Sequence, residues 1–420
     1  MLSKADNEVL VRTGPGTPMG ELYRRFWVPV MLADELGGPD SAPVRVKIMG
    51  EKLVAFRDTD GRVGLLHAYC PHRKANLFWG RNEEGGLRCI YHGWKFDVTG
   101  ACVDLPNCPE GPTLRRKVKT KAYPTLERGG IIWAYMGPPE KMPRFPAIEI
   151  FPTPPSHRYI TKIVARGNFM QFQEGDVDSS HVSFLHSNLQ KTPLPGSRVN
   201  PVVFADTMPR WFTKETDYGL MLAAQRNADE GRFHWRVNQW LMPFCTLIAA
   251  PPGLPILSQT RVPIDDEHSI LFRVWAHPDR PLTDAERATF AEGVIVPELI
   301  PGTFTTKENI DNDYLIDRDA QKTKTYSGIK SIVAQDLAVT QDQDGPIMDR
   351  SDEYLTSADR AIIELRKRLL RRAKELARGL EPPEPGHPEA YAVRPADFFL
   401  ARDVPVEEGG KEFLYAAAER

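Results

Sequence analysis

The sequence predicts an α+β protein in which a small all-β domain precedes a larger domain built from an antiparallel sheet and helices. Three observations lead to this prediction. Residues 44–66 alternate between apolar and polar side chains on both sides of a tight Asp60-Gly61 turn, which is typical of a β-hairpin. A longer series of strand patterns runs from 218 to 276. Residues 356–376 then have the apolar periodicity of a helix behind a capping box.

The remaining elements follow in chain order. Residues 8–30 predict a short helix and a lead-in segment, 131–135 predict a buried strand, and prolines between 139 and 155 mark a domain boundary near residue 150. Helical patterns recur at 283–291 and 329–342. We therefore divide the chain into an N-terminal segment (1–26), the β-domain (27–150), the larger domain (151–380) and a Pro- and Glu-rich C-terminal arm (381–420) expected to lie over the surface.

Composition excludes several classes of protein. The 420 residues are 41% hydrophobic, which suits a globular protein of two domains. Because 54 basic residues are balanced by 56 acidic ones, no basic surface is expected that would bind nucleic acid or an anionic membrane. No stretch of 18 apolar residues and no apolar run of signal-peptide length is present, so we expect a cytoplasmic protein.

Two pairs of metal-binding residues stand out in the β-domain. Cys70 and His72 are separated by one residue, and Cys89 and His92 by two. A structural zinc site also takes two Cys and two His, but it usually spaces each pair by two to four residues. The asymmetric spacing resembles the Rieske [2Fe-2S] signature instead, in which imidazoles replace two thiolates and raise the reduction potential. The other three cysteines, Cys102, Cys108 and Cys245, lack such spacing and are expected to be small buried side chains.

A second dense site lies between residues 168 and 186. Helical spacing places polar side chains on one face, and the same stretch contains two histidines. One interpretation is a solvated polar stripe. The other is that His181 and His186, with a carboxylate from elsewhere, form the two-His-one-carboxylate triad of non-haem iron oxygenases.

An alternating segment at 233–241 gives a candidate for substrate binding. One of its two faces carries His234, Arg236 and Asn238. This face either meets solvent or lines a pocket. In a pocket, Arg236 would offer a planar fork to a carboxylate, and Arg226 on the preceding strand could reach the same cavity.

Together, these stretches resemble the oxygenase components of Rieske non-haem iron oxygenases, and specifically the phthalate dioxygenase branch. The resemblance covers most of the chain and is carried by residues 14–20, the His-Gly-Trp loop at 92–94, and residues 309–322 and 345–351. It implies a Rieske domain followed by a helix-grip catalytic domain.

The resemblance also implies roles for individual residues. Cys70 and Cys89 would bind one cluster iron, and His72 and His92 the other. The mononuclear Fe²⁺ would be bound by His181, His186 and a distant carboxylate, for which Asp336 matches the family's position and Asp313, Asp317 and Asp342 are weaker candidates. Asp178 matches the acidic residue through which the cluster of one subunit passes electrons to the iron of its neighbour.

The activity implied is that of an enzyme that uses O₂ and electrons from NAD(P)H, delivered by a flavin- or iron–sulfur-containing reductase. The first hypothesis is phthalate-type ring dihydroxylation of an aromatic carboxylic acid. The second is O-demethylation of a methoxylated, lignin-derived acid such as 5,5'-dehydrodivanillate. The third is a Rieske electron carrier without catalysis. Electron transfer from the cluster of one subunit to the iron of its neighbour requires that the subunits form a closed ring, so we expect a homotrimer or a hexamer of stacked trimers.

Overall fold

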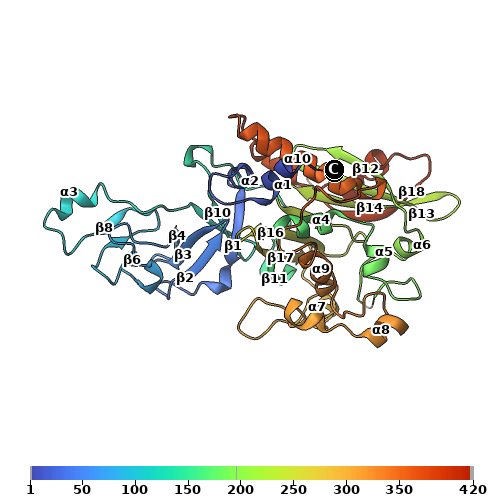
Figure 1. Cartoon of the computed structure of the whole chain (residues 1–420), viewed down its shortest axis with the longest axis horizontal. Coiled ribbons are helices and arrows are strands. Elements are labelled where there is room, and N and C mark those ends of the chain that lie inside the picture. Colours follow the sequence, from blue (N-terminus) through green and yellow to red (C-terminus); the bar gives the residue numbers. More distant parts are fainter. Residues whose placement is uncertain (1, 195, 417–420) are drawn as a thin grey trace.

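The computed structural model describes residues 2–194 and 196–416 and has two parts (Figure 1). A β-rich part formed by residues 27–135 lies at one end, and a larger part surrounds one extended antiparallel sheet. The predicted α+β class is confirmed. Among the residues that the structure describes, no helix is both long enough and apolar enough to cross a membrane.

The β-rich part contains three small antiparallel sheets. Their strand orders are β1 (Trp27–Leu32), β10 (Ile131–Tyr135) and β9 (Thr125–Arg128); β2 (Val44–Ile48), β3 (Glu51–Arg57) and β4 (Val63–His67); and β5 (Arg81–Glu83), β6 (Gly86–Arg88), β7 (Lys95–Phe96) and β8 (Cys102–Asp104). The short helix α3 (Gly111–Arg115) follows β8. The predicted hairpin turn joins β3 to β4, and Gly61 takes a φ of 81° there, which a side chain would disfavour.

The larger part is built on one antiparallel sheet. Its order is β11 (Arg158–Arg166), β17 (His268–Ala276), β16 (Ile256–Pro263), β15 (Cys245–Ile248), β14 (Arg232–Leu241), β13 (Gly219–Asn227) and β12 (Arg210–Glu215). The series of strand patterns expected between 218 and 276 coincides with strands β13 to β17.

The C-terminal region adds a further strand to this sheet. Strand β18 (Ala396–Ala401) pairs antiparallel with the first half of β14, which places Asp397 opposite Arg236. The expectation that residues 381–420 form an arm over the surface is therefore wrong for this stretch. The short helices α11 (Val406–Gly409) and α12 (Lys411–Leu414) follow β18.

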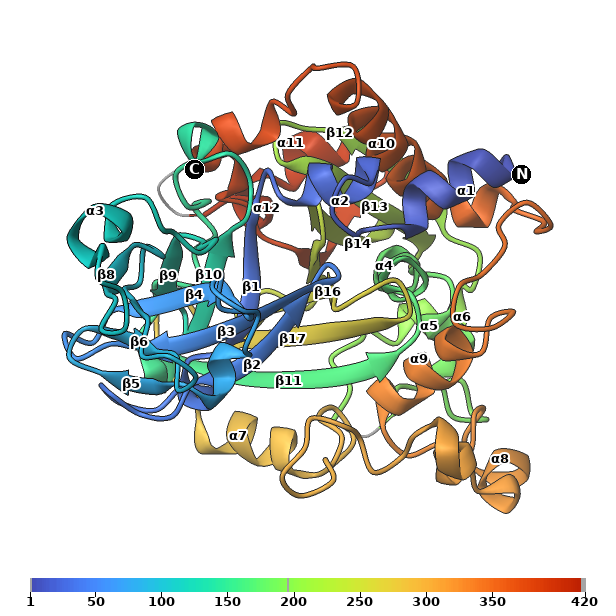
Figure 2. The same ribbon diagram turned by 60° about the vertical axis from the view of Figure 1, so that its left-hand side comes forward.

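Helices cover the sheet. Figure 2 shows α1 (Lys4–Val11), α2 (Pro18–Tyr23) and α10 (Arg360–Leu376) grouped together, and α4 (Phe169–Val177) contacts α1, α9 (Ile332–Gln341), α10 and the sheet. The remaining helices are α5 (Val182–Leu185), α6 (Val202–Ala205), α7 (Asp284–Ala291) and α8 (Arg318–Thr323).

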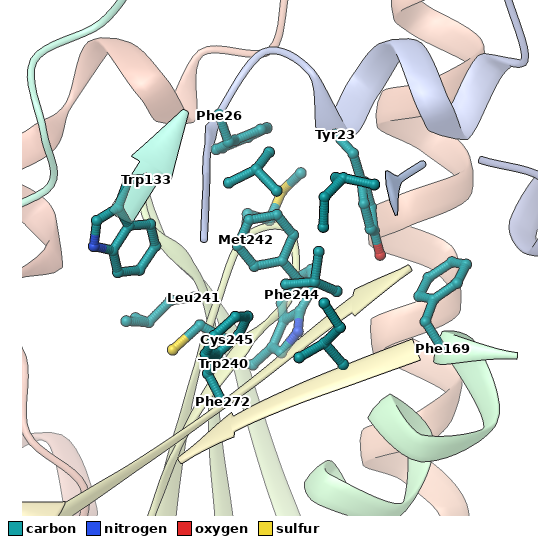
Figure 3. Close-up of a cluster of buried hydrophobic side chains, with 14 of the residues drawn as sticks. Tyr23, Phe26, Trp133, Phe169, Trp240, Leu241, Met242, Phe244, Cys245 and Phe272 are labelled. Carbon is teal, nitrogen blue, oxygen red and sulfur yellow. The ribbon is translucent and has the colours of Figure 1, made fainter. Parts of the chain in front are cut away.

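A continuous apolar core joins the N-terminal segment, the β-rich part and the larger part (Figure 3). Tyr23 of α2 packs edge-on against Phe169 of α4 and Phe244, with ring centroids 5.3 and 5.5 Å apart. Trp133 of β10 belongs to the same core. The two parts therefore share buried surface and do not hang from a flexible linker.

The basic face of α10 differs from the simplest expectation for a run of arginines, which is solvation. Arg366 and Arg368 are each only 4% exposed. Arg366 donates to Glu174 of α4 at 2.7 Å, and Arg368 donates to Glu384 at 2.7 Å. These buried arginines therefore hold α10 against α4 and against the segment beyond Gly379.

Candidate functional site

The two Cys/His loops have the same backbone design. The N–H of Cys70 donates to the carbonyl of the residue five positions later, at 2.8 Å, and the N–H of Cys89 does the same, at 2.8 Å. The residue just before that carbonyl is in the left-handed region in both loops, with φ of 59° at Lys74 and 79° at Gly93. At Gly93 a Cβ would lie 2.6 Å from a side-chain carbon of Pro106, so glycine is required there.

The loops bring the four candidate ligands together at the end of the β-rich part. Cys70 and Cys89 are 1% and 3% exposed, and the rings of His72 and His92 lie 4.5 Å apart. Trp94 stacks on His72 at 4.3 Å with nearly parallel rings. The tryptophan therefore fixes the orientation of one candidate ligand, in addition to packing beneath the loop.

The chemistry of these side chains fits a metal cluster. Burial and the neighbouring Cys89 raise the pKa of the Cys70 thiol to about 11, so a cation is needed to keep the Cys70 sulfur as a thiolate at neutral pH. The Nδ1 nitrogen of His92 is buried without a hydrogen-bond partner among the described residues, which is the state of an imidazole nitrogen reserved for a metal. Cys102 and Cys245 are buried as expected, whereas Cys108 is half-buried.

The predicted helix over 168–186 is shorter in the structure. Helix α4 ends at Val177, Asp178 is its C-cap, and α5 begins after His181. The carboxylate of Asp178 accepts hydrogen bonds from the backbone N–H groups of Ser180 and His181, at 2.7 and 3.2 Å. These local bonds offer the backbone an alternative to the helix and turn the chain toward the second site.

The polar stripe on α4 is buried, so its interpretation as a solvated face is wrong. Asn168 donates to the carbonyl of Val11 at 2.9 Å, and Gln171 donates to the carbonyl of Thr340 at 2.8 Å. Glu174 pairs with Arg350 of the 345–351 segment and with Arg366 of α10. Each polar residue ties α4 to a segment that is remote in sequence.

Three predicted ligands of the second site converge. The Nε2 atoms of His181 and His186 lie 3.2 Å apart, and the Oδ1 atom of Asp336 lies 3.0 Å from His186 Nε2 and 3.7 Å from His181 Nε2. Burial alone would raise the pKa of Asp336, but the two imidazoles hold it below its usual value, so the carboxylate is ionised. This trio is compact enough to hold one metal ion.

The hydrogen-bond partners on the far side of each imidazole ring determine which ring nitrogen faces Asp336 and the other ring. His181 Nδ1 lies 3.3 Å from the Asp178 carboxylate, and His186 Nδ1 lies 2.7 Å from the side-chain oxygen of Gln335. The Asp178 carboxylate and the Gln335 oxygen accept hydrogen bonds, so both Nδ1 atoms are donors. This leaves the two Nε2 atoms as the ones that a cation between the rings would bind.

Gln335 is a functional residue that the sequence did not single out by itself. It is completely buried on α9, next to Asp336, and its amide donates to the carbonyl of Ile329 at 2.7 Å. Its place directly before the candidate ligand Asp336, on a helix whose first turn is apolar, is the sequence signal that points to it.

The other carboxylates considered as ligands have structural positions. Asp317 caps α8 by accepting from the N–H groups of Asp319 and Ala320, Asp342 is the C-cap of α9, and Asp313 lies in a turn of left-handed residues. None of Asp313, Asp317 and Asp342 belongs to the trio.

A cavity of about 120 Å³ adjoins the trio. A cavity of about 150 Å³ accommodates benzene, so this one is of the size of a single aromatic ring. Trp275, Leu257 and Ile248 contribute apolar surface from the sheet, and the rest of the lining mixes polar and apolar residues from the sheet, the helices and the connecting segments.

Strand β14 contributes Arg236 and Asn238 to the cavity, and both are at least 95% buried. The interpretation of this strand face as solvent-exposed is therefore wrong. Arg226 is also buried but does not line the cavity. Its guanidinium donates to the backbone carbonyls of Ser179 and Asp206, at 3.0 and 2.9 Å.

Two further arginines line the cavity and were not predicted. Arg273 lies on β17, and Arg198 lies between α5 and α6. Arg273 is the one charged residue in the run 269–276, and a single charge inside a buried strand is a signal that could have found it.

The two sites lie in different halves of the molecule. The Cys/His loops belong to the end formed by β5–β8, whereas α5 and α9 lie on the far side of β16 and β17 in both views (Figures 1 and 2).

Comparison with known proteins agrees with this arrangement. A family model described as the Rieske [2Fe-2S] domain matches residues 26–124, and one described as LigXa C-terminal domain like matches residues 134–390. The 3-chlorobenzoate-3,4-dioxygenase oxygenase subunit of Comamonas testosteroni is 38% identical, over 94% of both chains. The phthalate 4,5-dioxygenase oxygenase subunit of Pseudomonas putida is 38% identical over 88% of this chain and 86% of the relative.

A more distant relative is the 5,5'-dehydrodivanillate O-demethylase oxygenase subunit of a Sphingobium strain, at 33% identity over 91% of this chain and 83% of the relative. Among solved structures, NdmA of Pseudomonas putida CBB5 aligns with a TM-score of 0.61 at 21% identity, over 96% of this chain and 99% of that chain. Dicamba monooxygenase aligns with a TM-score of 0.60 at 19% identity, over 85% and 99%. These two structures share the fold.

Proposed function

The chain belongs to the Rieske non-haem iron aromatic oxygenases, in the phthalate dioxygenase branch, and on that basis we propose that it dihydroxylates the ring of an aromatic carboxylic acid. It is the oxygenase component of a multicomponent system and works with a reductase and O₂. The observation that carries the substrate class is the cavity of single-ring size that places arginine side chains beside His181, His186 and Asp336.

The enzyme uses a [2Fe-2S] cluster and a mononuclear Fe²⁺ in each subunit. We assign the cluster to Cys70, His72, Cys89 and His92, and the Fe²⁺ to the trio described above. When bound, the cluster supplies single electrons and the ferrous ion activates O₂.

The residues around the trio hold its geometry and exclude water. Asp178 and Gln335 fix the two imidazoles so that both Nε2 atoms face the cavity. Trp275 is completely buried and forms part of the cavity wall, against which a flat ring can pack. These side chains would thereby keep bulk water away from the substrate carbon.

We assign the recognition of the substrate carboxylate to guanidinium groups of the cavity. Arg236 lies there, as its strand pattern suggested. Arg226 is committed to Ser179 and Asp206, so we give it the role of supporting the neighbourhood of Asp178.

O-demethylation of a methoxylated aromatic acid is the second candidate, favoured by the similarity to the dehydrodivanillate O-demethylase subunit. That substrate is a biaryl with two rings, whereas the cavity of about 120 Å³ suits one. The cavity therefore supports a single-ring acid. The trio and the cavity argue against a Rieske electron carrier without catalysis, because such a protein needs neither.

We further propose that the active assembly is a homotrimer or a hexamer. The cluster loops and the trio lie in different halves of one chain, so a neighbouring subunit would supply electrons to each trio (Figure 1). Asp178 is the candidate for the junction because its carboxylate contacts His181 and is 19% exposed. Trp79, Ile90 and Tyr91 near the cluster loops are exposed apolar side chains, which suits the docking of a protein partner.

Product analysis tests the proposal. The purified oxygenase and a reductase are given NADH, O₂ and a panel of phthalate, 3-chlorobenzoate and 4-methoxybenzoate. We expect a cis-dihydrodiol from a ring acid. Release of formaldehyde from 4-methoxybenzoate, with no diol from the other acids, would assign the protein to demethylation instead.

A further inference from the structure

The three arginines of the cavity differ in how their charges are balanced. They come from separate elements: Arg198 from the segment before α6, Arg236 from β14 and Arg273 from β17. A buried guanidinium without an anion is costly, so the least balanced of the three has the most to gain from a bound carboxylate.

Arg236 already has a carboxylate beside it. Asp397 of β18 lies opposite it in the strand register, with 3.9 Å between Arg236 Nη1 and Asp397 Oδ2. The same nitrogen donates to the carbonyl of Ala249 at 3.1 Å. Asp397 is completely buried at its side chain, so its charge is not screened by water.

Arg273 has no such partner. It is 4% exposed, and its one hydrogen bond among the described residues runs from Nη1 to the carbonyl of Ile295, at 2.7 Å. Its Nε is buried without a partner, as is that of Arg236, but within the described chain no carboxylate oxygen lies within 4.0 Å of the Arg273 guanidinium, and the carboxylates of Asp336 and Asp176 act on it only from farther away. Burial lowers the pKa of Arg273 to about 9, which leaves it cationic at neutral pH.

The surroundings of Arg273 suit an aromatic acid. Its guanidinium carbon lies 4.3 Å from the ring centroid of Trp275, two residues along the same strand face. In the register of β16 and β17, Arg273 is opposite Gln259 and Trp275 is opposite Leu257, and all four line the cavity. One wall therefore offers a fixed cation next to a flat apolar surface.

Arg198 is the weaker alternative. Its side chain is only partly buried, and its Nη1 donates to the carbonyl of Pro255 at 2.9 Å. Water can balance a partly exposed charge, so the free energy gained from a substrate carboxylate is smaller there.

We propose that Arg273 is the residue that anchors the substrate carboxylate, and that it sets the position of the ring relative to His181, His186 and Asp336. This inference rests on the proposed function and deepens it, because it assigns the specificity for acids to β17. Arg236 then has a secondary role in binding the substrate carboxylate, because Asp397 already lies beside its guanidinium.

The test measures binding to the iron-loaded protein without turnover. The affinities of benzoate and of benzamide, its uncharged analogue, are determined by calorimetry under anaerobic conditions, and quenching of tryptophan fluorescence gives a second signal. Losing a charge-assisted hydrogen bond costs enough to weaken binding about 10- to 100-fold. Arg273→Gln is expected to lose this much for benzoate and to leave benzamide unchanged.

Arg232→Gln is the matched control, because Arg232 begins β14 at the surface and pairs with Asp229. It should bind both compounds as the wild type does. If Arg273→Gln fails to fold or to load iron, Arg273→Lys keeps the charge without the planar fork, and a several-fold loss confined to benzoate is expected.

Two failures are distinguishable. If the wild type binds benzamide as tightly as benzoate, the proposal of an acid substrate falls, and this inference falls with it. If the wild type prefers benzoate and the Arg273 variants keep that preference in full, only the inference is overturned, and Arg236→Gln and Arg198→Gln then locate the anchor.

Discussion

Replacing Gln335 with leucine is expected to weaken iron binding while leaving the [2Fe-2S] cluster intact. The side-chain oxygen of Gln335 is the only partner of His186 Nδ1 among the described residues, at 2.7 Å, and leucine of similar size cannot accept that hydrogen bond. The His186 ring would then lose both its fixed tautomer and its orientation toward Asp336.

The size of the effect follows from the two groups left without partners. Loss of an outer partner of a metal-binding histidine typically lowers metal affinity about 10- to 100-fold, or about 1.4 to 2.7 kcal/mol. The His186 N–H and the Ile329 carbonyl would both be buried and unsatisfied, at roughly 1–3 kcal/mol each in folding stability. Gln335→Glu retains an acceptor for His186 and should hold iron better than Gln335→Leu.

The assay is an anaerobic titration of the iron-loaded protein with a coloured ferrous chelator, with the visible spectrum of the cluster followed in parallel. Gln190→Leu, at an exposed glutamine, is the control and should behave as the wild type does. Release of iron from Gln335→Leu at the same chelator concentration as from the wild type would refute the role of Gln335.

Three further results are expected. His72→Cys should keep a cluster but lower its potential, measured by redox titration, since a thiolate makes the cluster more negative; an unchanged potential would remove His72 from the ligands. Asp178→Asn should retain both metal centres, counted by iron analysis, and lose most of its O₂ consumption with reductase, whereas full activity would argue against a junction role. Glu174→Gln should destabilise the fold by about 3–5 kcal/mol in thermal or denaturant unfolding, because Arg350 and Arg366 would remain buried with their shared carboxylate gone. Burial would raise the pKa of Glu174, but these arginines lower it below its usual value of 4.5, so the stability it contributes is present above about pH 4.5 and is lost as the pH drops further. The fall in unfolding free energy below pH 4.5 should therefore be less steep in the variant than in the wild type. An equally steep fall would contradict this reasoning.

Local patterns in the sequence predicted much of the β-structure. The hairpin at 44–66 and the strands between 218 and 276 formed as expected, because alternation and turn residues act over a few positions. The trio was also reachable, since His181 and His186 are close in sequence, but the choice of Asp336 required the family resemblance.

The errors have a common physical origin in long-range partners. The stripe on α4 and part of the basic face of α10 carry residues that usually meet water, and they are buried because Glu174, Arg350 and Arg366 satisfy one another across more than 170 positions. The strand role of 396–401 likewise depends on pairing with β14. No periodicity within one segment reports such pairings. Arg273 and Gln335 were missed for the same reason, since Arg273 acquires a role only in the assembled cavity and Gln335 only through its contact with His186.

The burial of α4 has a consequence for how the protein opens. Almost every side chain of this helix is buried, and its polar groups are held by segments from α1, α9 and α10, so its amide hydrogens can exchange only when the whole domain unfolds. The segment after His186 is different, because Leu189, Gln190 and Lys191 are exposed. Its amides should exchange through local fluctuations. Hydrogen exchange would then divide the surroundings of His181 and His186 kinetically, with a rigid side at α4 and a side that opens and closes many times during the life of one folded molecule.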